Sequence, residues 1–147
     1  MKRILVSACL LGISCRYDGL SKENKELIEL GKKFEFFPVC PEILGGLPTP
    51  RVPSEIRNGK VINKDGIDVT DNYRKGAEDT LKICKICNID AVILKSKSPA
   101  CGKGKIYDGT FSGTLINGNG IAADLLLKNG IKVYTEEEFI KEFKKNN

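Results

Sequence analysis

Short continuous runs of apolar residues recur along the chain, separated by longer stretches of mixed character. Runs of this length, rich in Val, Ile and Leu, are typical of strands buried on both faces of a parallel sheet. The predicted strands cover residues 2–8, 33–39, 91–94 and 131–134. Pro38 is expected to stop the second strand, because proline cannot donate to a strand ladder.

The stretches between these runs repeat apolar residues every three or four positions, which predicts helices. The predicted helices cover residues 21–31, 70–87, 120–128 and 136–144. Thr70 or Asp71 is the expected cap of the second helix, and Gly31 is expected to end the first. Thr135 with Glu138 forms a capping box before the last helix.

Alternation of strands and helices predicts an α/β fold with a mostly parallel sheet and helices on both faces, a Rossmann-like arrangement. A small β-hairpin is expected from residues 60–62 and 67–69, around the turn-forming pair Asp65-Gly66. Residues 9–19, 40–54 and 96–114 are predicted to be loops, the last two rich in Pro or Gly. The 147 residues form one domain, 1–147, on the usual size relation.

Composition fits a soluble, cytoplasmic protein. The hydrophobic fraction is 41% and the charged fraction 29%, and no apolar run approaches the length of about 20 residues that a membrane span needs. The net charge is +5, and its lysines are scattered over predicted helix faces. This favours a solvated surface over a nucleic-acid-binding patch.

The chain has six Cys and no His, which limits the chemistry open to it. Histidine is the commonest general base and a frequent zinc ligand. Cysteines in this number in a cytoplasmic chain favour metal or redox use over a disulfide framework.

Cys9, Cys40 and Cys101 each follow a predicted strand. Ligands of open α/β sheets bind beyond the carboxyl ends of the strands, so three thiolates from separate loops are expected to meet there. Three Cys without His suit a 4Fe–4S cluster with one open iron better than a zinc site. Spacing alone leaves packing as core thiols an equal alternative.

Other polar or sulfur side chains are weaker candidates. Cys84 and Cys87 form a C-x-x-C pair, but at the end of a predicted helix, where core packing is favoured over redox use. Cys15 suits a resolving thiol or a spare ligand near Cys9, but a packed or idle thiol is the favoured interpretation. Glu42 and Ser98 lie two and three residues from Cys40 and Cys101. They suit a general base and an assisting hydroxyl, although position alone favours turn capping.

Five segments, in order, resemble the thiouracil desulfidase family. They are SACLLGISCRYDG (7–19), PVCPEILGGLPTPR (38–51), DVT (68–70), LKSKSPACG (94–102) and IYDGTFSG (106–113). The resemblance spans nearly the whole chain. It implies an α/β domain that holds a 4Fe–4S cluster on Cys9, Cys40 and Cys101 and hydrolyses thiouracil to uracil and hydrogen sulfide without redox change. The open iron would bind the substrate sulfur, Glu42 would activate water, and Ser98 would assist.

Three alternative functions differ from hydrolysis of free thiouracil in the substrate or in the class of protein. Relatives with an added C-terminal domain desulfurate thiouridine in tRNA, and the end of this chain soon after its last helix favours a free thiolated pyrimidine instead. A redox or sensor module would use four cluster ligands rather than three. A zinc-stabilised binding module is the third alternative. The sequence carries no signal for an oligomeric state.

Overall fold

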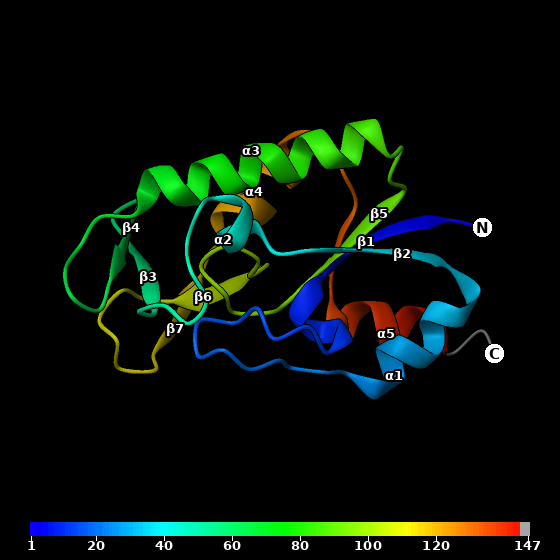
Figure 1. The fold of residues 1–147 in the computed structure, drawn as a ribbon, viewed down its shortest axis with the longest axis horizontal. Helices are drawn as coiled ribbons and strands as arrows, with labels where there is room; N and C mark the ends of the chain where they lie inside the picture. Colours follow the sequence, from blue (N-terminus) through cyan, green and yellow to red (C-terminus); the bar gives the residue numbers. More distant parts are fainter. Residues whose placement is uncertain (145–147) are drawn as a thin grey trace.

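The computed structural model describes residues 1–144. They form a four-stranded sheet with helices packed against it (Figure 1). All three strand pairs are parallel, and the strand order is β2-β1-β5-β8. The strands are β1 (Arg3–Ser7), β2 (Glu35–Val39), β5 (Ala91–Leu94) and β8 (Val133–Thr135). Each lies within one residue or two of a predicted strand, because the buried apolar runs mark the sheet directly.

The central pair of strands forms the most deeply buried part of the sheet. Leu5 of β1 lies opposite Val92 of β5, and both are fully buried. Pro38 continues β2 rather than stopping it, opposite Val6. An edge strand tolerates proline because the missing donor can fall on its unpaired side, and β2 is such an edge.

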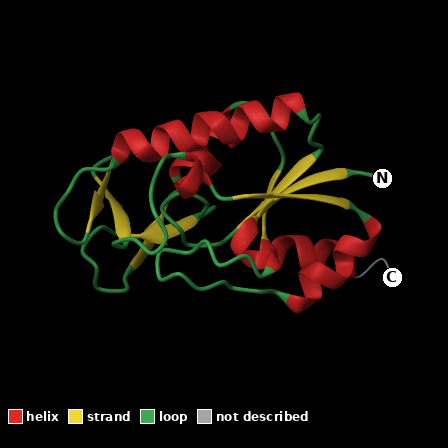
Figure 2. Ribbon diagram, viewed as in Figure 1, coloured by secondary structure: helices red, strands yellow, loops and turns green. Residues whose placement is uncertain are grey.

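Helices cover both faces of the sheet, as predicted (Figures 1 and 2). Successive residues of β1 point to opposite faces: Ile4 and Val6 belong to one apolar cluster and Leu5 to the other. The first cluster includes residues of α1 and α5, and the second includes residues of α3 and α4. The bounds are α1 (Lys25–Leu30), α3 (Thr70–Ile86), α4 (Ile121–Lys128) and α5 (Glu136–Lys144).

Two helix starts differ from expectation. The first helix begins at Lys25 rather than near residue 21, because the Asn24 side chain accepts a hydrogen bond from the Leu27 amide and caps it there. Thr70 lies inside α3 and its hydroxyl accepts from the Val61 amide of β4 instead of capping.

The capping box before α5 is confirmed. Glu138 N donates to Thr135 Oγ1 and Thr135 N donates to Glu138 Oε1, at 3.1 and 2.9 Å. This reciprocal pair satisfies donors that the first turn of the helix leaves open.

The hairpin forms one strand earlier in the chain than predicted, so that residues 60–62 lie in its second strand and not in its first. The strands β3 (Ser54–Arg57) and β4 (Lys60–Asn63) pair around Asn58-Gly59, whose φ angles are 51° and 75°. Two positive φ values match the tight turn that two-residue hairpins favour, and Asn-Gly is the usual pair for it. Residues 67–69 only flank β4, through the bridge Ile62↔Asp68.

Short elements interrupt all three predicted loops. The helical turn α2 (Pro41–Leu44) directly follows Cys40, and the strands β6 (Lys105–Tyr107) and β7 (Leu115–Asn117) form a second hairpin. Cys9 lies in a 3-10 turn, Ala8–Leu11. Elements of three or four residues are too short to display a hydrophobic period, so the sequence did not reveal them.

Two glycines allow α2 to lie directly on α3. A Cβ added at Gly76 of α3 would stand 1.9 Å from the Pro41 carbonyl oxygen, and one at Gly45 would stand 2.0 Å from that of Asn72. Only residues without a side chain permit such a backbone approach. The contact therefore sets the position of the segment that carries Cys40 and Glu42.

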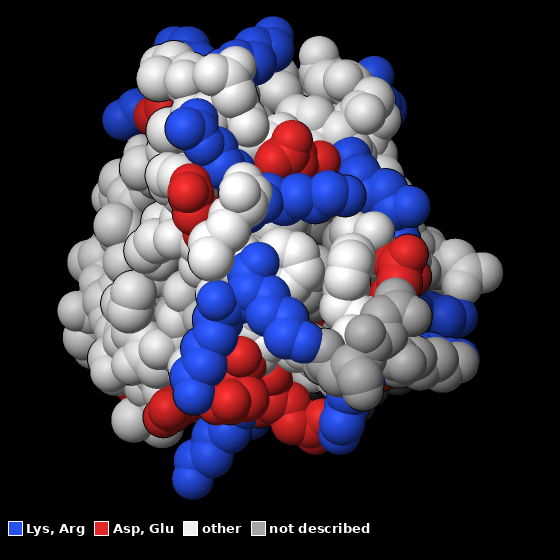
Figure 3. All heavy atoms as spheres, turned by 90° about the vertical axis from the view of Figure 1, so that its right-hand side faces the viewer, with Lys and Arg blue, Asp and Glu red and all other residues white. Residues whose placement is uncertain are grey.

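Charges of both signs are interspersed on the end of the molecule where the parallel strands begin (Figure 3). Arg3 and Glu35, at the first residues of β1 and β2, pair there at 3.5 Å. None of the helices in residues 1–144 combines the length and apolar character needed to cross a membrane.

The contact between α2 and α3 predicts that Gly76→Ala destabilises the protein, although alanine usually favours a helix by about 1 kcal/mol. The added methyl group would displace α2, and overpacking of this kind costs on the order of 1–3 kcal/mol. Denaturant unfolding should show the loss. Lys75→Ala, at an exposed neighbouring position, is the control and should change stability little; equal stability of both variants would contradict the prediction.

Candidate thiol-lined functional site

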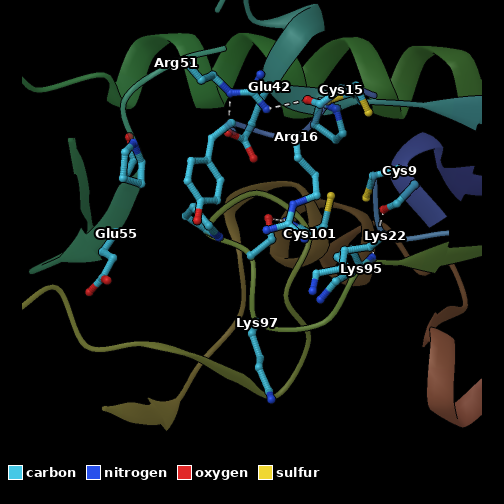
Figure 4. Close-up of a pocket in the computed structure, with 18 of the residues that line it drawn as sticks. Cys9, Cys15, Arg16, Lys22, Glu42, Arg51, Glu55, Lys95, Lys97 and Cys101 are labelled. Carbon is cyan, nitrogen blue, oxygen red and sulfur yellow. Dashed lines mark hydrogen bonds and ion pairs between the residues drawn. The ribbon is translucent and has the colours of Figure 1, made fainter. Parts of the chain in front are cut away.

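A cavity of about 590 Å³ opens beyond the carboxyl ends of β1, β2 and β5 (Figure 4). Residues directly after these strands form one wall, and the two hairpins contribute another. Its lining includes the predicted site residues Cys9, Cys40, Glu42, Ser98 and Cys101. The topology thus brings together groups that are far apart in the sequence, as expected for the open edge of a parallel sheet.

The three predicted ligand thiols come from three separate segments. Cys9 lies in the turn after β1, Cys40 joins β2 to α2, and Cys101 lies in the loop after β5. Cys9 and Cys101 are buried and Cys40 is half-buried. The thiols thus lie between the core and the cavity rather than on the outer surface.

A fourth thiol, Cys15, lies among them. It is buried, lines the cavity and is within hydrogen-bonding reach of both Cys9 and Cys40. The Cys40 Sγ also lies 3.8 Å from the Cys15 carbonyl oxygen. Cys15 is buried, as expected of the packed thiol that the sequence favoured, and it also lies near Cys9 at the cavity, as expected of the spare ligand or resolving thiol that the sequence left open. Its position six residues after Cys9, in a loop that must fold back, was the available signal.

Without a bound metal group, the Cys40 and Cys101 thiols are weaker acids than a free cysteine. Burial raises the pKa of Cys101 to about 12, although hydrogen bonds from Ser7 and Ser98 oppose this. Hydrogen bonding to Cys15 and burial raise the pKa of Cys40 well above its usual range. At neutral pH these two groups are protonated, so binding of a metal group would displace their protons.

Glu42 is held by two donors on one carboxylate oxygen. Arg51 Nε donates to Oε1 at 3.0 Å and Tyr73 OH donates to the same atom at 2.8 Å. The Arg51 and Glu42 side chains are only 5% and 16% exposed, so their attraction is weakly screened. Burial raises the pKa of Tyr73, and the neighbouring Glu42 charge raises it further, so the phenol stays a donor.

Arg51 also braces the loops around the carboxylate. Its Nη2 donates to the Cys15 carbonyl at 2.9 Å, and its Nη1 donates to the Pro48 carbonyl and to Thr49 Oγ1, each at 3.1 Å. Burial opposes the charged guanidinium, but the charge and hydrogen bond of Glu42 outweigh it and leave the pKa of Arg51 raised. Arg51 was not among the site residues predicted from the sequence; a lone arginine within a proline-rich stretch was its signal.

Ser98 caps the turn that presents Cys101. Its Oγ accepts from the amides of Ala100 and Cys101 at 3.1 and 3.0 Å. The Ser98 hydroxyl is also within hydrogen-bonding reach of the Cys101 thiol. Turn capping, the role that position alone favoured, is therefore what the geometry displays, and the hydroxyl hydrogen is left to donate towards the site.

The C-x-x-C pair lies elsewhere. Cys84 is buried in the apolar cluster beneath α3, where burial raises its pKa to about 11. Cys87 is the C-cap residue of that helix, and its carbonyl oxygen accepts from Arg3. Neither residue lines the cavity. Core packing of Cys84 is confirmed.

The donor set suits a cluster better than a single ion. In residues 1–144 no three Cys, Asp or Glu side chains converge closely enough to hold one metal ion. A 4Fe–4S cluster is a larger body whose ligands stand apart around its outside, and thiolates are its usual ligands. The thiols of Cys9, Cys40 and Cys101, from three separate segments around one cavity, fit that requirement, whereas a zinc site needs its ligands in one tight tetrahedron.

The cavity lining is positively charged. Glu42 is neutralised by Arg51, and both amide donors to Glu55 come from the β6–β7 loop, whereas Lys22, Lys64 and Lys97 form no ion pair within the described residues. A cluster held by three thiolates is anionic, so this lining favours it electrostatically. Lys95 and Lys97 both line the cavity.

Known proteins share this architecture. A model of the 2-thiouracil desulfurase family matches residues 4–138. Uncharacterized protein YbbK of Bacillus subtilis (strain 168) is 45% identical over 145 residues, which cover 92% of this chain and 96% of that protein. The solved structure of the 4Fe-4S-dependent thiouracil desulfidase TudS superposes with a TM-score of 0.89 at 42% identity, covering 96% of this chain and 95% of that one.

The buried ion pair predicts a large loss of stability on Arg51→Met. Removing the guanidinium leaves Glu42 charged in a largely buried position, which costs on the order of 3–5 kcal/mol. Arg3→Met is the matched control, because the side chains of Arg3 and Glu35 are 45% and 49% exposed. Exposed pairs contribute about 0–1 kcal/mol. Urea unfolding of both variants checks this, and similar losses in the two would refute it.

Proposed function

The chain belongs to the 2-thiouracil desulfurase family, and we propose that it is a 4Fe–4S-dependent desulfidase acting on a small thiolated pyrimidine. The reaction exchanges sulfur for oxygen: thiouracil and water give uracil and hydrogen sulfide, with no change in redox state. The observation that carries this is the meeting of Cys9, Cys40 and Cys101 at one cavity, in a fold shared with TudS over nearly its full length.

Cys9, Cys40 and Cys101 are the proposed cluster ligands. Each follows a strand of the central sheet, so their backbone positions are fixed by the most buried part of the fold. A cluster bound by three thiolates supplies an open iron, a soft Lewis acid suited to the sulfur of a thiocarbonyl group. The Cys101 thiol, deeply buried, depends on the Ser7 and Ser98 hydroxyls for hydrogen bonds to its anionic form.

Glu42 is the proposed general base. Arg51 and Tyr73 both engage Oε1, and no described residue donates a hydrogen bond to Oε2. The carboxylate is therefore held in a fixed orientation with Oε2 left to accept a proton from water. A base fixed by two donors needs little reorganisation when the water attacks the substrate carbon.

Ser98 is proposed to serve in two ways. Its oxygen holds the turn of Cys101 through two amide hydrogen bonds. Its hydroxyl hydrogen remains available to donate to substrate or to the Cys101 sulfur. Donors aimed at developing negative charge stabilise the transition state, so both uses favour loss of sulfide.

The cavity supports a free base or nucleoside as the substrate, in preference to thiouridine within tRNA. A volume of about 590 Å³ is typical of sites for small molecules. We further propose that residues 1–147 act as one domain in the cytoplasm, where thiols stay reduced; all six cysteines are free.

Loss of any one of the three ligand thiols should abolish both cluster and activity. The protein, reconstituted anaerobically with iron and sulfide, should show the visible absorption of an iron–sulfur cluster and release sulfide from 2-thiouracil or 4-thiouracil. Cys9→Ala, Cys40→Ala and Cys101→Ala should lose the absorption, the bound iron and the sulfide release together, because a cluster on two thiolates is not retained.

Cys84→Ala is the control, since this thiol lies in the core and away from the cavity. It should keep iron and activity. Binding of zinc in place of iron by the wild type, or loss of the cluster in Cys84→Ala alone, would overturn the three-ligand site.

Glu42→Gln and Ser98→Ala should separate chemistry from cluster binding. Glu42→Gln preserves shape and should retain the cluster absorption while kcat falls by about 10²–10⁴-fold, the usual contribution of a general base. Ser98→Ala removes the cap of the Cys101 turn and should lower both iron retention and kcat. Steady-state sulfide release and iron content measure these effects. Wild-type kcat in Glu42→Gln would rule out the base.

A further inference from the structure

The side of the cavity opposite the thiols carries aromatic side chains. Tyr107 ends β6, and Phe111 lies in the loop between β6 and β7; both line the cavity and are half-buried. In Figure 4, Glu55 of β3, which binds this loop, lies across the cavity from Cys9. The site therefore has a thiol wall from the sheet and an aromatic wall from the hairpins.

Phe111 has an unusual backbone conformation. Its φ is +57°, in the left-handed region that bulky side chains rarely adopt. Such a residue is retained only where its surroundings hold it, and residues of this kind cluster at functional sites. Glycine would adopt the same angle freely.

Glu55 is the main clamp on this conformation. Its Oε1 accepts hydrogen bonds from the amides of Gly109 and Phe111 at 3.0 and 3.1 Å. Gly109 itself lies directly on β3: an added Cβ would stand 2.8 Å from the Ile56 carbonyl oxygen. The loop closes through the Asp108 amide, which donates to the Thr114 carbonyl at 3.0 Å.

Core packing does not explain the strained phenylalanine. Within residues 1–144, neither apolar cluster that surrounds the sheet includes Phe111 or Tyr107. The neighbours in the loop are small and polar, and Thr110, Ser112 and Thr114 hydrogen-bond to one another. Phe111 is thus held in an unfavourable backbone conformation at the wall of the cavity. A ligand bound in the cavity would be in a position to contact its ring.

We infer that Phe111 contacts the substrate by stacking on its pyrimidine ring, with Glu55 as the positioning residue that holds it there. The inference rests on the proposed function for the identity of the ring. Flat bases stack on aromatic side chains through their faces, whatever their substituents. Phe111 therefore contributes affinity for the ring, while the sulfur is recognised at the thiol wall.

The test compares Phe111→Gly with the wild type, both as reconstituted holoenzyme. Uracil binding by calorimetry and the KM for 2-thiouracil should each weaken by about tenfold or more, the usual effect of losing one stacked base contact. The kcat should stay within about twofold, because stacking is made equally before and during the reaction. The thermal midpoint should not fall, since glycine relaxes the backbone. Phe111→Tyr should bind as the wild type does.

Three further variants test the inference. Glu55→Ala retains the ring but not its clamp and should raise KM, whereas Glu55→Gln, which keeps an acceptor oxygen, should restore it. Ile116→Ala, on the same hairpin but outside the cavity lining, should leave KM unchanged.

The outcomes distinguish the inference from the proposed function. Unchanged uracil binding and KM in Phe111→Gly overturn the stacking contact, even if the wild type is an active desulfidase. If the wild type releases no sulfide, the proposed function fails, whereas weaker uracil binding in Phe111→Gly would still support the contact. A fall in thermal midpoint equal to that of a core deletion would instead assign Phe111 a packing role and overturn the inference.

Discussion

The ion pair between Arg51 and Glu42 holds the functional end of this molecule together. One guanidinium binds a carboxylate beside Cys40, the carbonyl of Cys15 and the proline-rich loop that contains Pro48. Its donors are satisfied in a position almost closed to water, so each bond is strong and each loss costly. Three irregular segments are thereby fixed relative to one another without a strand or long helix among them.

Contacts that involve the backbone also position the segments around the cavity. Gly45 and Gly76 let α2 rest on α3, which places Cys40 at the edge of the cavity. Across the cavity, Glu55 clamps the loop of Phe111 onto β3. The site is therefore assembled from a rigid sheet and from loops whose conformations are imposed by specific tertiary contacts, the arrangement that precise positioning of reacting groups requires.

The chemistry follows from what the chain lacks as well as from what it holds. Because the chain has no histidine, the proposed general base is a carboxylate and the proposed metal ligands are thiols. Burial raises the pKa of the Cys101 thiol, so it becomes a ligand only when a cationic centre replaces its proton. The positively charged lining favours the anionic assembly that results. The proposed metal ligands and the proposed base thus lie close together on one wall of the cavity.

The sequence by itself determined the α/β fold, the four strands and the placing of Cys9, Cys40 and Cys101, because buried apolar runs mark parallel strands and ligands collect beyond their carboxyl ends. The family motifs narrowed the chemistry further. Only the tertiary structure displays the contacts of Arg51 and the backbone conformation of Phe111. Arg51 binds the Cys15 carbonyl, which lies far away in the sequence, and the position of Phe111 depends on its own φ angle. Neither feature produces a periodic pattern in the sequence.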